Sequence, residues 1–131
     1  MNTVASRCFP IQSLCEDNGC LTVFDETTLP FVVRRAFTVQ APAGAIRGQH
    51  AHRVSTQALV VLVGAVRVSL TDARGTTDMV LHPGEQGLIV PPMIWCEQRY
   101  LDPLSVLLVL CDTPFNEAEY IRDFDEFRYL T

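Results

Sequence analysis

The stretch "GAIRGQHAHR", residues 44–53, decides the fold of this chain. It holds two of the three histidines, His50 and His52, with one alanine between them. In a strand, residues two apart project to the same side, so both imidazoles are expected on one face. Such a pair can bind a metal, transfer protons or pack in a core. The surrounding sequence has to decide among these three roles.

Short apolar segments on both sides of this stretch predict an all-β protein. They are rich in Val, Leu, Ile and aromatic residues, and turn signals such as "DARG" and "HPGEQG" separate them. We expect strands within residues 20–25, 31–40, 57–72, 78–82, 86–92, 94–100 and 104–112. Only residues 116–130, where Asn116 can cap a first turn, favour a short helix or two helical turns. This pattern is typical of an antiparallel sandwich or barrel.

Length and composition predict a single globular domain over residues 1–131. Hydrophobic residues make up 48% of the chain and charged residues 19%, which excludes a disordered chain, and the apolar runs are too short for membrane spans. The N-terminus has no basic region followed by an apolar run, so we expect a cytoplasmic protein. The five cysteines are irregularly spaced and odd in number, which favours reduced thiols over a disulfide framework.

The basic residues point to an anionic small molecule. The net charge is -5, which argues against nucleic acid, and no membrane partner is expected either. All basic side chains are arginines, and four of them lie close in sequence to the histidine pair, namely Arg34, Arg35, Arg47 and Arg53. Guanidinium groups match phosphate or carboxylate geometry. The alternative, that these four arginines are solvated surface charges, stays open.

The histidine stretch resembles the first motif of the cupin superfamily, whose fold is a double-stranded jelly-roll barrel. The motif has the spacing found here for Gly44, His50, His52, Gln57 and Gly64. Metal-binding cupins usually carry glutamate in place of Gln57 and histidine in place of Cys96. A neutral amide is a weaker ligand for a hard cation than a carboxylate, so the usual metal is not expected. A zinc site made by His50, His52 and Cys96 remains an alternative.

A closer resemblance runs from about Pro30 to the C-terminus. It rests on "PFVVRRAF" (30–37), "RGQHAHR" (47–53), "GLIVPPMIW" (87–95) and "DTPFNEAEYIRDFDEF" (112–127). These segments resemble the nucleotide-sugar 3,4-ketoisomerases, or WxcM-like cupins. The resemblance implies a cytoplasmic enzyme without metal or other cofactor that acts on dTDP-4-keto-6-deoxyglucose in deoxysugar biosynthesis. It also implies a homodimer that exchanges N-terminal strands, here within residues 1–25.

The implied reaction moves a keto group from sugar carbon 4 to carbon 3. It needs a proton removed at carbon 3, an enediol, and a proton returned at carbon 4. Imidazole suits this transfer because both of its protonation states are accessible near neutral pH. By position, His52 is the first candidate for the base, and His50 is expected to position the sugar or share the proton.

The remaining candidates are expected to bind substrate. Arg35 and Arg47 can hold the diphosphate or stabilise an enediolate oxygen. Gln57 can hydrogen-bond a sugar hydroxyl or serve as a structural amide. Trp95 can stack on a thymine base, although packing in the core is the favoured alternative. His82, at a turn, is expected to face solvent.

Two positions depart from the family pattern. Phe37 replaces an expected tyrosine, and Cys96 replaces an expected histidine. Thr38, Cys96 or a water are therefore candidates to complete the proton relay. The same departures leave open a module that binds a nucleotide sugar without turning it over, and a metal-dependent cupin is the third alternative.

Overall fold

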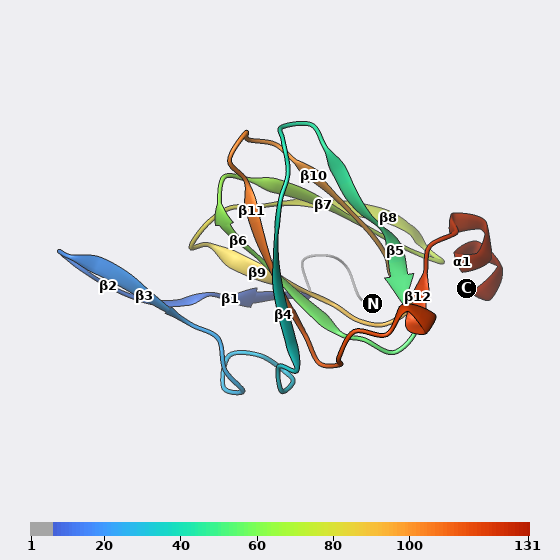
Figure 1. Cartoon of the computed structure of the whole chain (residues 1–131), viewed down its shortest axis with the longest axis horizontal. Helices are drawn as coiled ribbons and strands as arrows, with labels where there is room; N and C mark the ends of the chain where they lie inside the picture. The colour runs from blue at the N-terminus through green and yellow to red at the C-terminus, as the bar shows by residue number, and fades with distance from the viewer. Residues whose placement is uncertain (1–6) are drawn as a thin grey trace.

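Two antiparallel five-stranded sheets face each other in this computed structural model, which describes residues 7–131 (Figure 1). In spatial order the first sheet holds β1 (Cys8–Pro10), β9 (Gln86–Val90), β6 (Gln57–Val63), β11 (Val106–Cys111) and β4 (Arg35–Gln40). The second holds β12 (Tyr120–Ile121), β5 (Ile46–His52), β10 (Trp95–Tyr100), β7 (Val66–Asp72) and β8 (Gly75–Leu81). The prediction of an all-β jelly roll is confirmed.

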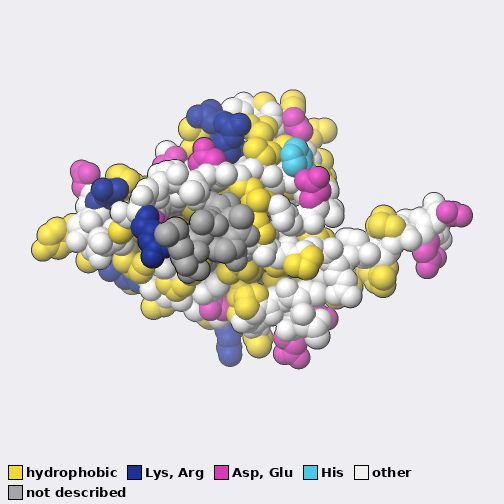
Figure 2. Space-filling view, turned by 180° about the vertical axis from the view of Figure 1, so that it is seen from behind, with side chains coloured by type: hydrophobic (Ala, Val, Ile, Leu, Met, Phe, Trp, Pro, Cys, Tyr) yellow, Lys and Arg dark blue, Asp and Glu magenta, His cyan; other side chains and the backbone are white. Residues whose placement is uncertain are grey.

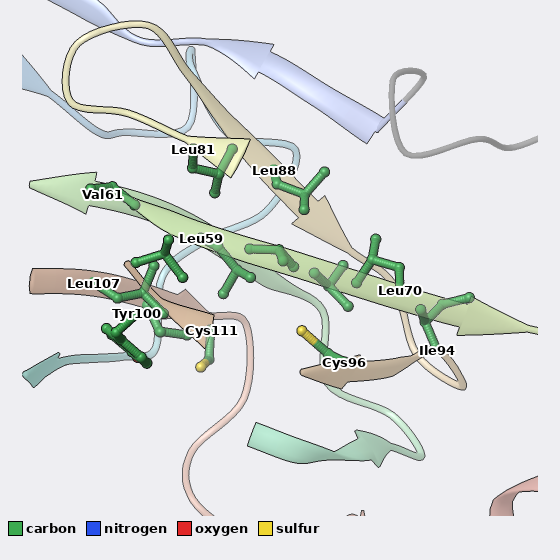
Figure 3. Packing of buried hydrophobic residues seen from close by; sticks show 14 residues of the cluster. Leu59, Val61, Leu70, Leu81, Leu88, Ile94, Cys96, Tyr100, Leu107 and Cys111 are labelled. Atoms are coloured by element: carbon green, nitrogen blue, oxygen red, sulfur yellow. The ribbon is translucent and has the colours of Figure 1, made fainter. Parts of the chain in front are cut away.

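The core fills the space between the two sheets. Figure 3 shows Leu59 and Leu88 of the first sheet packed with Leu70 of the second. From Gln57 to Val61, strand β6 is buried on both faces, because Val60 points away from this core into a second cluster that includes Leu29. The lack of alternation along β6 follows from this double burial. The core joins the two sheets, which also carry the inward-facing polar residues.

A two-stranded arm projects from the body of the molecule (Figures 1 and 2). It consists of β2 (Gln12–Glu16) and β3 (Gly19–Val23), which pair with each other, and its apolar residues Leu14 and Leu21 are about 61% and 60% exposed. The apolar pattern predicted one strand here, at residues 20–25, and the family resemblance implied N-terminal strands within residues 1–25. Residues 1–6, at the start of the predicted N-terminal strand region, lie outside the described residues.

The arm also corrects the prediction of reduced thiols. Cys15 and Cys20 face each other across the β2–β3 pair and form a disulfide. Cys96 and Cys111 are free thiols in the barrel. The prediction was wrong for the first pair because the hairpin register, which places the two cysteines opposite each other, is not visible in their irregular spacing.

The C-terminal segment closes one end of the barrel. It contains a 3₁₀ helix, η2 (Glu117–Glu119), capped by Asn116, and an α-helix, α1 (Phe124–Leu130), capped by Asp123. The predicted two helical turns are confirmed, but β12 separates them because Tyr120 pairs with His52 of β5. Within residues 7–131 no helix is both long enough and apolar enough to cross a bilayer.

Candidate active site

A polar cavity of about 210 Å³ lies between the sheets, at the end of the barrel that the C-terminal segment covers. Its apolar walls come from Val39, Leu59, Leu107 and Val109, together with the rings of Phe37 and Phe115. Its polar lining consists of Arg35, Arg47, His50, Gln57, Gln98, Tyr120 and Arg122. Three arginines and one imidazole around a small cavity suit an anionic ligand whose reacting part is buried.

A β-bulge aims His50 into this cavity. The pairing of β5 with β10 shifts register between Cys96 and Glu97, where Gly48 (φ 82°) and Gln49 (φ 55°) adopt left-handed backbone conformations. Bulges of this kind turn a strand and redirect its side chains. A Cβ on Gly48 would lie 2.9 Å from the backbone carbonyl oxygen of Cys96 and 2.8 Å from the Gln98 side chain, so the bulge also needs glycine there.

His50 is held as a neutral base. Its Nδ1 lies 2.8 Å from the Gly48 carbonyl oxygen, which can only accept, so the ring donates from Nδ1 and keeps a bare Nε2. Burial, aided by the neighbouring His52, lowers the pKa of His50 to about 4. The imidazole is therefore unprotonated at neutral pH and can accept a proton.

His52 belongs to a buried pair behind the cavity wall. Its Nδ1 donates to Glu119 Oε2, and Glu119 Oε1 accepts from the backbone N–H groups of Val54 and Ser55, each at 3.1 Å. Burial alone would raise the pKa of Glu119, but these hydrogen bonds outweigh it and hold the pKa below its usual value. The carboxylate thus fixes the tautomer and orientation of His52. The two imidazole rings meet edge to face at 4.9 Å.

Tyr120 brings a phenol to the cavity. Its Oη accepts a hydrogen bond from Arg35 Nη1 at 3.0 Å. Its ring centroid lies 5.1 Å from that of His50 and 4.3 Å from that of His52, and the Arg122 guanidinium lies 4.4 Å from the ring centre. The register of β12 on β5 sets this position, because Tyr120 lies directly opposite His52.

A family model described as "FdtA: WxcM-like, C-terminal" matches residues 5–131, almost the whole chain. The chain belongs to this family. The resemblance inferred from "RGQHAHR" and the terminal segment is therefore confirmed.

Similar proteins from three bacteria agree with this assignment to the FdtA, WxcM-like family. The TDP-4-oxo-6-deoxy-alpha-D-glucose-3,4-oxoisomerase of Aneurinibacillus thermoaerophilus is 31% identical over 119 residues, which cover 89% of this chain and 86% of the relative. A 3,4-ketoisomerase from Helicobacter canadensis superposes with a TM-score of 0.89 at 29% identity, covering 94% of each chain. A variant of the 3,4-ketoisomerase QdtA from Thermoanaerobacterium thermosaccharolyticum, crystallised with TDP-4-keto-6-deoxyglucose, superposes with a TM-score of 0.90 at 25% identity, covering 94% of this chain and 91% of that one.

The cavity of this family member contains some of the residues proposed from sequence. Arg35, Arg47 and Gln57 line it, as does His50. His52 is buried and does not line it, so the prediction that His52 is the first candidate for the base stays a prediction. The two histidines share a face as expected, but only His50 lines the cavity, and His52 lies against Tyr120 and Glu119.

Three proposed site residues lie elsewhere. Thr38 is exposed on the outer face of β4, because Phe37 takes the inward position. Trp95 packs between β10 and α1 against Phe127, with Nε1 donating to Glu97 at 3.0 Å, so its favoured role as a core residue is the one observed. None of the three lines the cavity. The third is Cys96.

The Cys96 thiol is part of the apolar core (Figure 3). Burial raises its pKa to about 12, and it accepts a hydrogen bond from Gln98 Nε2 at 3.2 Å. It therefore stays a neutral thiol. In the described part of the chain no three His, Cys, Asp or Glu side chains come together as metal ligands, so His50, His52 and Cys96 do not form the zinc site considered above. His82 is exposed, as expected.

Sequence reasoning assigned no role to Glu119, Tyr120 or Arg122. All three lie in the terminal segment that carried the family resemblance, which was the available signal. Their partners are far away along the chain: Glu119 is 67 residues from His52, and Tyr120 is 85 residues from Arg35. Local patterns of period two cannot show such contacts.

A larger groove, of about 580 Å³, opens at the other end of the same strands. It is lined by Gln40, Ala41, Pro42, Val63, Pro103, Leu104, Ser105 and Val106. None of these lining residues is titratable. Volume alone therefore does not identify the reactive site, and the smaller polar cavity is the one that can carry out proton chemistry.

Proposed function

We propose that this protein is a sugar-nucleotide 3,4-ketoisomerase that converts a dTDP-4-keto-6-deoxyhexose to its 3-keto isomer through an enediol. The observation that carries the proposal is the neutral imidazole of His50, which keeps Nε2 unprotonated and lines a cavity together with three arginines. The relatives support the substrate, because one is named for TDP-4-oxo-6-deoxyglucose and another was crystallised with the corresponding keto sugar.

The cavity fits the sugar end of such a substrate. Its volume of about 210 Å³ is below the roughly 300–1,000 Å³ of sites that enclose a whole drug-sized ligand. The hexose therefore enters, and the diphosphate lies at the mouth beside Arg47, which is exposed. Gln57 hydrogen-bonds a sugar hydroxyl from the barrel wall. No metal or organic cofactor is part of the proposal.

Proton transfer at carbon begins with His50. Its Nε2 removes the proton from carbon 3, and the arginines around the cavity stabilise the negative charge that develops on the carbon 4 oxygen. The proton then returns to carbon 4. His52 acts as a positioning residue, because Glu119 holds it against the edge of the His50 ring.

The arm supports a homodimer. An isolated two-stranded hairpin is marginally stable in water. Here Leu14 and Leu21 remain exposed on an arm that projects from its own barrel (Figure 2). We propose that each arm, within residues 1–25 of the single 1–131 domain, packs on the barrel of a partner copy. A cytoplasmic location is part of the same proposal, and cell fractionation tests it.

The activity is tested with dTDP-4-keto-6-deoxyglucose in deuterated water. The wild-type protein should form the 3-keto product and incorporate deuterium into the ring, and His50→Asn should do neither. Elemental analysis of the same sample tests the metal-dependent alternative. Binding of dTDP without exchange or product would instead favour the non-catalytic module and would refute the proposed activity.

A further inference from the structure

The net isomerisation moves two protons, and the proposed function accounts for one of them. The first moves between carbon 3 and carbon 4, which is the work of His50. The second leaves the hydroxyl oxygen on carbon 3 and reaches the oxygen on carbon 4. A group within the cavity has to give a proton to one oxygen and take a proton from the other.

Few of the described lining residues can exchange a proton. Arg35, Arg47 and Arg122 stay protonated in proteins, and the amides of Gln57 and Gln98 do not act as acids or bases. Phe37 presents a phenyl ring without a hydroxyl. Apart from His50, the phenol of Tyr120 is the lining group able to release and recover a proton.

We propose that Tyr120 carries the oxygen-bound proton between the two substrate oxygens. This inference rests on the proposed function. As His50 Nε2 takes the proton from carbon 3, the Tyr120 O–H gives its proton to the carbon 4 oxygen, and the C3=C4 enediol forms. The phenolate then takes the proton from the carbon 3 hydroxyl as C3=O forms, and His50 Nε2 returns its proton to carbon 4. Both residues end as they began, and the oxidation of carbon 3 balances the reduction of carbon 4.

The surroundings of Tyr120 suit a phenol that becomes negative for part of the cycle. Arg35 already donates to its oxygen at 3.0 Å, so the counter-charge is in place before the proton leaves. The Arg35 guanidinium is itself fixed between two rings, 4.5 Å from the centre of Phe37 and 4.9 Å from that of Phe115. A second cation, Arg122, lies 4.4 Å from the centre of the Tyr120 ring.

Geometry also separates the two proton carriers. The ring centroids of Tyr120 and His50 are 5.1 Å apart, so one hexose can meet both groups. Tyr120 also contacts His52, at 4.3 Å between ring centroids, and His52 is hydrogen-bonded to Glu119. Tyr120 is thus held in one orientation by its neighbours, with its hydroxyl beside Arg35 at the cavity.

The test compares Tyr120→Phe with Tyr129→Phe, a matched loss of a hydroxyl from a side chain that is 89% exposed. Tyr120→Phe should lower the isomerisation rate by about 10²- to 10⁴-fold, the usual loss for one general acid or base. It should lower deuterium exchange at carbon 3 less, because His50 still removes and returns that proton. The ratio of exchange to product therefore rises. Tyr129→Phe should match the wild type in both.

Two results overturn the assignment of Tyr120 alone: an active wild type with Tyr120→Phe isomerising within about threefold of it, or equal losses of exchange and product. If the wild-type protein neither exchanges nor isomerises, the proposed function fails together with this inference. Thermal melts and dTDP calorimetry on Tyr120→Phe should match the wild type, which separates lost proton transfer from lost folding or binding.

Discussion

Replacing Glu119 should destabilise the protein in proportion to the number of hydrogen bonds that the replacement loses. The carboxylate accepts from His52 Nδ1 and from two backbone N–H groups, those of Val54 and Ser55, each at 3.1 Å. Glu119→Ala leaves all three donors without their acceptor and should lower the free energy of unfolding by about 3–5 kcal/mol, as when one partner of a buried pair is removed.

Glu119→Gln distinguishes the hydrogen bond from His52 from the two hydrogen bonds that backbone N–H groups donate. The amide oxygen can still accept from the two backbone groups, so the loss is confined to the charge-assisted bond with His52, about 1.5–3 kcal/mol. Because the amide nitrogen donates, His52 must change tautomer or turn away from it. The activity should fall in both variants, since His52 no longer supports the edge of the His50 ring.

The assay is urea unfolding followed by circular dichroism, with all proteins at one concentration because dimerisation would shift the midpoint. Nitrogen NMR of the imidazoles reports the His52 tautomer in the same samples. If both variants unfold within about 0.5 kcal/mol of the wild type, or if Gln and Ala cost the same, the hydrogen-bonding argument is refuted.

Three further predictions concern acidity, the bulge and the arm. Since the pKa of His50 is lowered to about 4, kcat/KM should fall as pH drops through about 4; an acid limb near the ordinary histidine value of about 6.5 would contradict this. Between pH 4 and pH 6.5 the imidazole of residue 50 is protonated in the unfolded chain but neutral in the folded one. The free energy of unfolding should therefore also decrease as pH falls from 6.5 to 4. Gly48→Ala should cost about 1–3 kcal/mol, because it combines a positive φ with a Cβ 2.9 Å from the backbone carbonyl oxygen of Cys96; a melting curve like that of the wild type would disprove the requirement. Leu14→Asp should shift a dimer toward monomers in light scattering, whereas Leu104→Asp, at a leucine of the barrel that is 76% exposed against 61% for Leu14, should not; equal effects would exclude the arm as the interface.

Much of the fold follows from local patterns along the sequence. Strand-forming segments separated by turn signals predicted most of the barrel, because side-chain alternation and turn chemistry are properties of neighbouring residues. The same period of two placed His50 and His52 on one face. Gly64 of the cupin spacing also has a local reason. Its φ is 81°, and a Cβ added there would lie 2.5 Å from Ser105 Oγ, so the position favours glycine.

The chemistry of the site depended on tertiary structure. His50 lines the cavity, whereas His52 is buried against Tyr120 and Glu119 of the C-terminal segment, and hydrophobic periodicity does not reveal such contacts. Glu119 and Tyr120 reach their partners only because the C-terminal strand β12 adds to β5. The sequence therefore determined the barrel, the histidine pair and the family. Folding decided which imidazole lines the cavity and which phenol lies beside it, because strand pairing joins segments that no local pattern connects.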